Sequence, residues 1–324
     1  MKNQNNLDSK YLNKIKNIKF KPVFIMGLHR SGTSILYKLL GETKKFNVVN
    51  AYHMVYYDQL LYNHENNLEE KFKQQLNQKL QQKNNEDRGI DKLKVYADLP
   101  EEYVFIITRK TLLRYINPLN KDIFIEMCKK IQYISENNKK PLILKNPYDF
   151  PNFLYIKKIF PDAKFIFIHR HPLKIISSTL KAEASLYKKL NQYYSQMDNN
   201  YVKIFKIPLL HKIIYLLYSK LGVLGTIQIT NYSKKAVNYY FKNIDKISEE
   251  DYVIIKYEDL CENPNQIMEN ILHFLGFKEK NNIDFRKYIS PRKLQLDPTI
   301  IKLKNFIYKS MKKYFDFLGY ELDE

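Results

Sequence analysis

The sequence predicts an α/β protein with a mainly parallel sheet, helices on both faces of the sheet and helical insertions between the strands. Three apolar runs, at residues 23–26, 141–147 and 163–168, are short enough to be buried strands. The first and the third are each followed by a polar turn and then by apolar residues at helical spacing. Strands that alternate with helices in this way are typical of a parallel sheet.

The 324 residues are 44% hydrophobic and 14% aromatic, which is enough to bury one large α/β domain or two small ones. The chain has only 8 Gly and 12 Pro, so we expect no long flexible linker. We therefore expect a basic, loosely helical lead-in at residues 1–20 and a single domain at residues 21–324.

The formal charge of +20 favours an anionic ligand or partner, such as nucleic acid, an anionic surface or an anionic cofactor. Lysines scattered among Asn and Ile also arise from AT-rich coding, so the charge alone does not indicate nucleic acid. Cys128 and Cys261 lie far apart without ligand spacing, which predicts neither a zinc site nor a disulfide framework. Residues 1–19 contain no apolar segment typical of a signal peptide, so we expect a cytoplasmic protein.

The loop after the first predicted strand has the pattern of an anion-binding loop. Gly27 and Gly32 have the spacing of a nucleotide phosphate loop, but the lysine that follows the second glycine in ATP- and GTP-binding loops is absent. The loop carries its own cation, Arg30, whose planar fork suits a tetrahedral oxyanion. Hydroxyl donors and a helix N-terminus favour the same ligand, and the donors are Ser31, Thr33 and Ser34. The alternative is a strand-turn-helix corner whose polar residues are incidental.

With the apolar strand before it, the segment L-H-R-S-G-T-S resembles the 5′-phosphosulfate loop of the sulfotransferases that use 3′-phosphoadenosine 5′-phosphosulfate (PAPS). That loop is usually written P-R-S-G-T-T, so His29 stands in place of Pro and Ser34 in place of the second Thr. The resemblance implies that the loop binds PAPS through Arg30, Ser31, Gly32, Thr33 and Ser34.

A second motif lies at residues 160–180, F-P-D-A-K-F-I-F-I-H-R-H-P-L-K-I-I-S-S-T-L. Arg170 follows a strand, and a bend at His171-Pro172 can fold it over the next helix, so that Arg170 and Ser178 share one phosphate. The segment resembles the family's 3′-phosphate motif, F-P-x-A-K-x-I-x-x-x-R-D-P with a Ser eight positions after the Arg. The interval is kept, and His171 stands where Asp is commonest.

A third resemblance covers residues 251–276, where V-I-I-K-Y-E-D-L precedes a helix that ends L-H-F-L-G-F. It implies that Tyr257 contacts the nucleotide. Glu258 and Asp259 are expected to hold the sheet edge or cap a turn, since carboxylates facing PAPS would repel it. Family members also close the nucleotide site with a basic segment, for which the candidates are Ser290, Arg292 and Lys293.

The candidate catalytic cation is Lys145, at the end of the apolar run at residues 141–147. A lysine at a strand end can simply extend its ammonium group into solvent. The segment also resembles the family's L-K-x-P, in which the lysine stabilises the transferring sulfonate. The resemblance therefore implies a catalytic role for Lys145 beside Arg30.

The candidate bases are a histidine and two glutamates. His53 follows a possible strand at residues 46–49, at the edge of the sheet where ligands bind, and imidazole titrates near neutral pH. A structural histidine is the alternative. Glu101 and Glu102 are expected in the first turn of a helix that begins at Pro100 and is capped by Asp98, where the helix dipole favours carboxylates. The family often carries a similar D-x-P-E-E segment, so a role for one of them in proton abstraction or acceptor binding stays open.

Helical insertions at residues 58–138 and 180–243 are expected to form the walls of an acceptor pocket. Apolar residues recur at helical intervals over residues 58–86, which predicts an amphipathic helix. The most apolar stretch, residues 207–229, is interrupted by basic residues, so we expect a helix that docks on the core or on an acceptor rather than a membrane span. Peripheral contact with a membrane stays open.

The resemblance implies transfer of the sulfonate from PAPS to a hydroxyl or amine of a small molecule, carbohydrate, lipid or peptide, with neither a metal nor nucleic acid. A P-loop kinase that uses ATP and Mg²⁺ is the first alternative, and the missing lysine counts against it. A non-catalytic basic binder of an anionic polymer is the second. Such a protein would not need Arg170 and Ser178 in their relation to the first loop.

Overall fold

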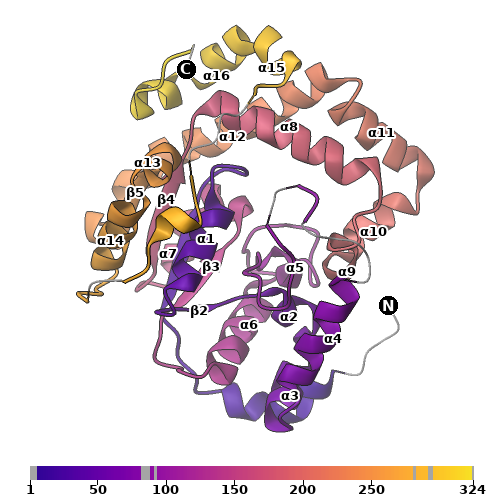
Figure 1. The fold of residues 1–324 in the computed structure, drawn as a ribbon, viewed down its shortest axis with the longest axis vertical. Coiled ribbons are helices and arrows are strands. Elements are labelled where there is room, and N and C mark those ends of the chain that lie inside the picture. The colour runs from indigo at the N-terminus through magenta and orange to yellow at the C-terminus, as the bar shows by residue number, and fades with distance from the viewer. Residues whose placement is uncertain (1–5, 82–87, 91–92, 280–281, 291–294, 323–324) are drawn as a thin grey trace.

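A computed structural model describes residues 6–81, 88–90, 93–279, 282–290 and 295–322 of the chain. Within these residues a parallel sheet of five strands lies at the centre of the fold, with the order β2-β3-β1-β4-β5 (Figure 1). This confirms the predicted α/β class with its mainly parallel sheet. The strands are β1 (Pro22–Met26), β2 (Asn47–Val48), β3 (Leu142–Lys145), β4 (Lys164–His169) and β5 (Tyr252–Lys256).

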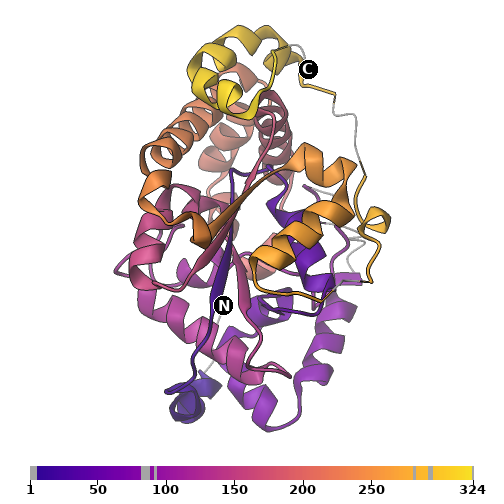
Figure 2. The same ribbon diagram turned by 90° about the vertical axis from the view of Figure 1, so that its left-hand side faces the viewer.

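Helices cover both faces of the sheet because successive strand residues are buried on opposite sides. Phe24 and Met26 enter one core, whereas Val23 and Ile25 enter the other. The core of Val23 and Ile25 is covered by α1 (Thr33–Glu42), α13 (Tyr257–Glu262) and α14 (Pro264–Phe274). Figure 2 shows the strands between the two layers of helices.

The larger core, on the opposite face, is covered by helices from the rest of the chain. They are α2 (Ala51–Val55), α3 (Leu60–Glu65), α4 (Glu69–Gln81), α5 (Val104–Ile107), α6 (Lys121–Ile134), α7 (Phe153–Ile159), α8 (Pro172–Lys188), α12 (Gly222–Asn243), α15 (Pro298–Lys302) and α16 (Lys304–Leu318). Between α8 and α12 the chain forms α9 (Tyr194–Met197), α10 (Asn199–Phe205) and α11 (Pro208–Tyr218) along the rim of the molecule (Figure 1).

The two long helices expected in the insertions are each broken. Residues 58–81 form a short 3₁₀ turn, then α3 and α4, which are separated near Asn67, a residue in the left-handed region with φ 56°. The rest of the expected helix, residues 82–86, lies outside the described residues. In the second insertion α11 and α12 meet at an angle of 82°.

The prediction of a helix that begins at Pro100 is wrong. Pro100 instead forms an isolated antiparallel bridge with Asn50, and the next helix, α5, begins at Val104. Asp98 does not cap that helix and accepts a hydrogen bond from Asn50 Nδ2 at 3.1 Å. The bridge pairs segments fifty residues apart, so local sequence signals could not indicate it.

The lead-in is packed rather than loose over Leu7–Ile15, a 3₁₀ helix that contacts α3 and α6. Its Asp8 is fully buried and forms an ion pair of 2.9 Å with Lys130, whose ammonium group also lies 3.0 Å from Glu126. The lead-in is therefore fixed to the body of the fold by a buried charge pair.

Lys130→Met is expected to lower the free energy of unfolding by about 3–5 kcal/mol, because it leaves the Asp8 carboxylate buried without its cation. Urea denaturation measures the change. The matched control is Lys139→Met, an exposed lysine, for which we expect a change within about 0.5 kcal/mol. Equal losses in the two variants would show that the buried pair adds nothing to stability.

Candidate functional site

The register of the sheet brings three distant segments to one point at its carboxyl edge. β1 lies between β3 and β4, with Ile25 opposite Lys145 and Met26 opposite Phe167. The loop that follows β1 therefore starts beside Lys145, and Arg170 follows three residues after Phe167. In open α/β sheets, ligands bind at this edge, at the point where the connections from two neighbouring strands run in opposite directions along the sheet.

The conformation of the loop after β1 requires both of its glycines. A Cβ atom on Gly27 would lie 2.5 Å from the carbonyl oxygen of Ile168. Gly32 has φ 103°, and a Cβ atom there would lie 2.3 Å from the ring of Tyr257. Arg30 between them is also in the left-handed region, with φ 68°. The loop is thus a tight turn pressed against the neighbouring strand β4 and against α13.

A cavity of about 270 Å³ opens beside this loop and the N-terminus of α1. Its walls come from the loop, from the residues after β3, β4 and β5, and from the segment near residue 90. The walls are rich in cations, which favours an anionic occupant. Of the residues expected at the site, the walls include Arg30, Gly32, Thr33, Ser34, Arg170 and Tyr257.

The two arginine motifs meet directly. Arg170 Nη1 donates to the carbonyl oxygen of Arg30 at 3.0 Å, and Arg30 Nε donates to Ser178 Oγ at 3.1 Å. The guanidinium of Arg170 stacks 4.2 Å from the ring centre of Tyr257. Ser31 Oγ and Arg170 Nε are buried, and neither has a hydrogen-bond partner among the described residues. Buried donors without partners beside a cationic cavity fit an anion that would accept from them.

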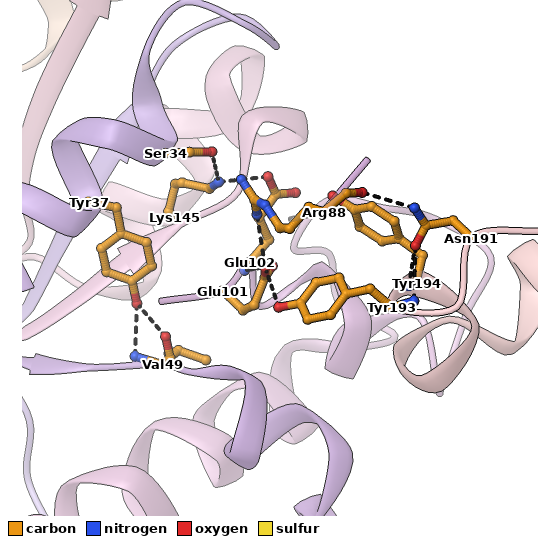
Figure 3. A network of polar contacts seen from close by, with 10 residues as sticks. All are labelled: Ser34, Tyr37, Val49, Arg88, Glu101, Glu102, Lys145, Asn191, Tyr193 and Tyr194. Carbon is orange, nitrogen blue, oxygen red and sulfur yellow. Dashed lines mark hydrogen bonds and ion pairs between the residues drawn. The ribbon is translucent and has the colours of Figure 1, made fainter. Parts of the chain in front are cut away.

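Lys145 lies at the same edge with a carboxylate and a hydroxyl. Its side chain is 1% exposed, and Nζ donates to Ser34 Oγ at 2.8 Å and pairs with Glu102 Oε1 at 2.7 Å (Figure 3). Burial opposes ionisation of Glu102, but the charge and hydrogen bond of Lys145 outweigh it and hold the pKa of Glu102 below its usual value. Glu102 also lines the cavity, whereas Lys145 lies behind it and contacts two of the wall residues, Ser34 and Glu102.

The partners of the Glu101 carboxylate differ from those of Glu102. Its carboxylate is buried, pairs with Arg88 at 2.8 Å and accepts from the hydroxyl of Tyr193 at 2.8 Å (Figure 3). The backbone carbonyl of Arg88 in turn accepts from Asn191 Nδ2 at 2.9 Å. Glu101 therefore joins the segment around Arg88 to the chain after α8, and all of its visible contacts are structural.

His53 does not line the cavity. It lies in α2, where its Nδ1 accepts from the backbone N–H of Asn50 at 3.2 Å while Asn50 accepts from the backbone N–H of His53. Burial, with a smaller contribution from Lys73, lowers the pKa of the His53 imidazole to about 3. The expectation that it faces a ligand is corrected because the ring caps its own helix.

The cavity has further residues that the sequence motifs did not single out. Lys38 lies four residues after Ser34 on α1, and this helical spacing is the signal that could have found it. His29, which replaces the usual proline, lines the cavity, and burial lowers its pKa to about 4. Arg88 and Tyr288 had no local signal. Of the expected basic closing segment, Ser290 lines the cavity, whereas Arg292 and Lys293 lie outside the described residues.

The Glu258 carboxylate, which follows β5, makes structural contacts. Glu258 accepts from the backbone N–H of His171 at 3.3 Å and from the hydroxyl of Tyr320. These contacts connect β4, β5 and the end of the chain.

The parallel sheet, the glycine loop that leads into α1 and the cations around it define an α/β protein of the P-loop-like class.

The chain belongs to the sulfotransferase family, whose model matches residues 22–221, more than half of its length. Sulfotransferase STF9 from Mycobacterium avium has a similar structure, with 14% identity, a TM-score of 0.63 and coverage of 97% of this chain and 80% of that one. Sulfotransferase STF1 from Mycobacterium tuberculosis H37Rv is 15% identical, with a TM-score of 0.55 and coverage of 97% and 78%. At these identities the structures show a shared fold. No curated protein sequence matches this chain. The family establishes a transferase whose chemistry is sulfonyl transfer.

Proposed function

We propose that the protein transfers the sulfonate group of PAPS to a hydroxyl or amine of an acceptor. The observation that supports this most directly is the contact between the two arginine motifs, in which Arg170 donates to the carbonyl of Arg30 and Arg30 donates to Ser178. Two separate anion-binding motifs joined in one cavity suit a ligand with phosphate groups at two positions, as in PAPS.

The residues of the loop would hold the 5′ end of the donor. The backbone N–H groups at Gly32 and Thr33 stand at the N-terminus of α1, where the helix dipole favours an anion. Arg170 would bind the 3′-phosphate together with Ser178, and Tyr257 keeps the arginine in place by stacking against it.

In the reaction the bond between sulfur and the phosphate oxygen breaks and a bond from sulfur to the acceptor forms, so that adenosine 3′,5′-bisphosphate leaves. Lys145 and Arg30 would neutralise the charge that develops on the leaving oxygen. Lys145 is already fixed by Ser34 and Glu102, so it would need little reorganisation.

We assign the general base to Glu102. Among the three expected candidates, His53 caps α2 and Glu101 is held by Arg88 and Tyr193, whereas Glu102 lines the cavity beside Lys145. A carboxylate of low pKa is a weak base. A weak base is sufficient when the acceptor loses its proton late in the reaction, as it does when a phosphoryl group passes through a loose transition state.

Calorimetry of adenosine 3′,5′-bisphosphate binding tests the donor site without an acceptor. We expect metal-independent binding that is much tighter than that of ATP or 5′-AMP, and about 10- to 100-fold weaker binding in Arg170→Ala. The matched control is Arg286→Ala, since Arg286 is exposed and pairs only with the nearby Asp284 in the described part of the chain. A preference for ATP with Mg²⁺ would refute the proposal in favour of a kinase.

The pH dependence of turnover tests the choice of base. Glu102, with its lowered pKa, stays ionised to below the ordinary carboxyl value of about 4.3. His29 and His53, with pKa values of about 4 and about 3, stay neutral above pH 5. We therefore expect kcat to stay level from about pH 8 down to about pH 5 and to fall only at lower pH as Glu102 gains a proton. A fall centred near pH 6.5 would contradict Glu102 as the base.

A further inference from the structure

The second insertion carries an exposed apolar surface on the rim of the molecule. We call it the apolar corner and define it as residues 207–224, which comprise α11 and the first turn of α12 (Figure 1). None of the residues of α11 is buried. The most exposed apolar side chains of the corner are Leu209 (70%), Ile213 (55%), Leu224 (53%) and Ile207 (52%). Exposed apolar side chains that lie together typically mark a surface that binds a protein, a membrane or a ligand.

The bend and the packing of the corner favour contact with a membrane surface over a membrane span. In the described residues no single helix is long and apolar enough to span a bilayer. α11 and α12 together have the length and composition of a span, but the chain bends by 82° between them. α12 also packs in the protein core, where it buries Ile229, Ala236 and Tyr240. Gly225 packs so closely that a Cβ atom would lie 2.6 Å from the carbonyl oxygen of Leu217, which fixes α12 against α11.

The chain segment that contains the corner carries charges of a single sign. Residues 199–244 contain seven lysines and no aspartate or glutamate. Four of these lysines lie in or beside the corner and are exposed, namely Lys203, Lys206, Lys212 and Lys220. A second copy of the chain would bring the same positive charges to the interface, so self-association is disfavoured. An anionic surface is attracted to them instead.

We propose that the apolar corner docks the protein on the surface of anionic lipid bilayers. The leucines and isoleucines enter the boundary between headgroups and acyl chains, and the lysines lie against anionic headgroups. A bilayer is fluid and can cover apolar side chains that project from two helices at a sharp angle, which a flat protein surface would not. The inference does not depend on the proposed reaction.

Co-sedimentation with vesicles tests the proposal. The wild-type protein is expected to bind vesicles of phosphatidylcholine mixed with phosphatidylglycerol, to bind pure phosphatidylcholine vesicles at least about tenfold less, and to be released by salt. A variant with Leu209→Ser, Ile213→Ser and Leu224→Ser is expected to bind the anionic vesicles at least about tenfold more weakly. Its control carries Leu112→Ser and Leu119→Ser, which change leucines of 80% and 74% exposure outside the corner.

A second pair of variants tests the charges. Replacing three of the lysines in or beside the corner, Lys206→Gln, Lys212→Gln and Lys220→Gln, is expected to weaken vesicle binding about tenfold or more. The same change at the exposed lysines 71, 79 and 110 is expected to weaken it less than about threefold.

Three results would overturn the proposal: no binding to anionic vesicles, equal losses in a corner variant and its control, or a concentration-dependent dimer of the wild type that the serine variant abolishes. Thermal unfolding, measured on each variant by circular dichroism, verifies that it is folded without relying on the donor site. A failure of vesicle docking therefore leaves the proposed donor site standing, and a failure of the donor site leaves the docking surface standing.

Discussion

Lys145→Met is expected to lower the rate of sulfonate transfer by about 100- to 1,000-fold, because the transition state loses a preorganised cation at the leaving oxygen. Binding of adenosine 3′,5′-bisphosphate should change less than about threefold, since Arg30 and Arg170 line the cavity independently of Lys145. The rate is measured as release of adenosine 3′,5′-bisphosphate from PAPS, with the best acceptor from a screen of alcohols, phenols and amines, or with water.

The Lys145→Met variant needs a control because it leaves the Glu102 carboxylate without its cation. Glu102 loses its ion pair in Lys145→Met, so part of any effect could come from a disturbed fold. A double variant with Glu102→Gln removes both charges, so its thermal stability should recover toward that of the wild type. Its turnover should stay well below that of the single variant Glu102→Gln, which lacks only the proposed base. Turnover that recovers together with stability would contradict a direct role of Lys145 in the reaction.

Gly32→Ala is expected to weaken binding of adenosine 3′,5′-bisphosphate at least about 100-fold. A Cβ atom at this position would collide with the ring of Tyr257, so either the loop with its N–H groups or the ring that stacks on Arg170 must move. Loss of two hydrogen bonds to a charged phosphate costs about 3 kcal/mol or more, which corresponds to about 100-fold in affinity.

The chain offers a matched control in Gly276→Ala. Gly276 also has a positive φ, 86°, but a Cβ atom there meets nothing within 4 Å. Both variants therefore carry the backbone strain of a left-handed alanine, about 1–2 kcal/mol, whereas only Gly32→Ala adds the collision. Calorimetry should find normal affinity in Gly276→Ala. Equal affinity in both variants would mean that the loop does not bind the ligand.

The sequence predicted those parts of the fold and site that depend on contiguous residues. β1, β3 and β4 were each expected from an apolar run, and the glycine loop was expected from its spacing. In a parallel sheet the carboxyl ends of strands share one edge, so the contact between Arg30 and Arg170 follows from two local motifs and one rule of topology.

What the sequence could not predict depends on pairing between distant segments. The bridge between Asn50 and Pro100 replaces the expected helix at Pro100, and it also sets where Glu101 and Glu102 point. The expected helix-dipole role of the two glutamates is therefore replaced by ion pairs, one with Arg88 and one with Lys145. His53 was expected at the ligand edge from its place after a strand, but a hydrogen bond to Asn50 decides the direction of its ring.

The link between Arg170 and the carbonyl of Arg30 has a consequence for turnover. The phosphate groups that these arginines would bind remain on the nucleotide after the sulfonate has left, so the attraction that captures the donor does not fade when the reaction is complete. Under the proposed function, the spent nucleotide would compete with fresh donor for the same cations. Product release would then limit the steady-state rate, and the enzyme would depend on another activity that removes adenosine 3′,5′-bisphosphate.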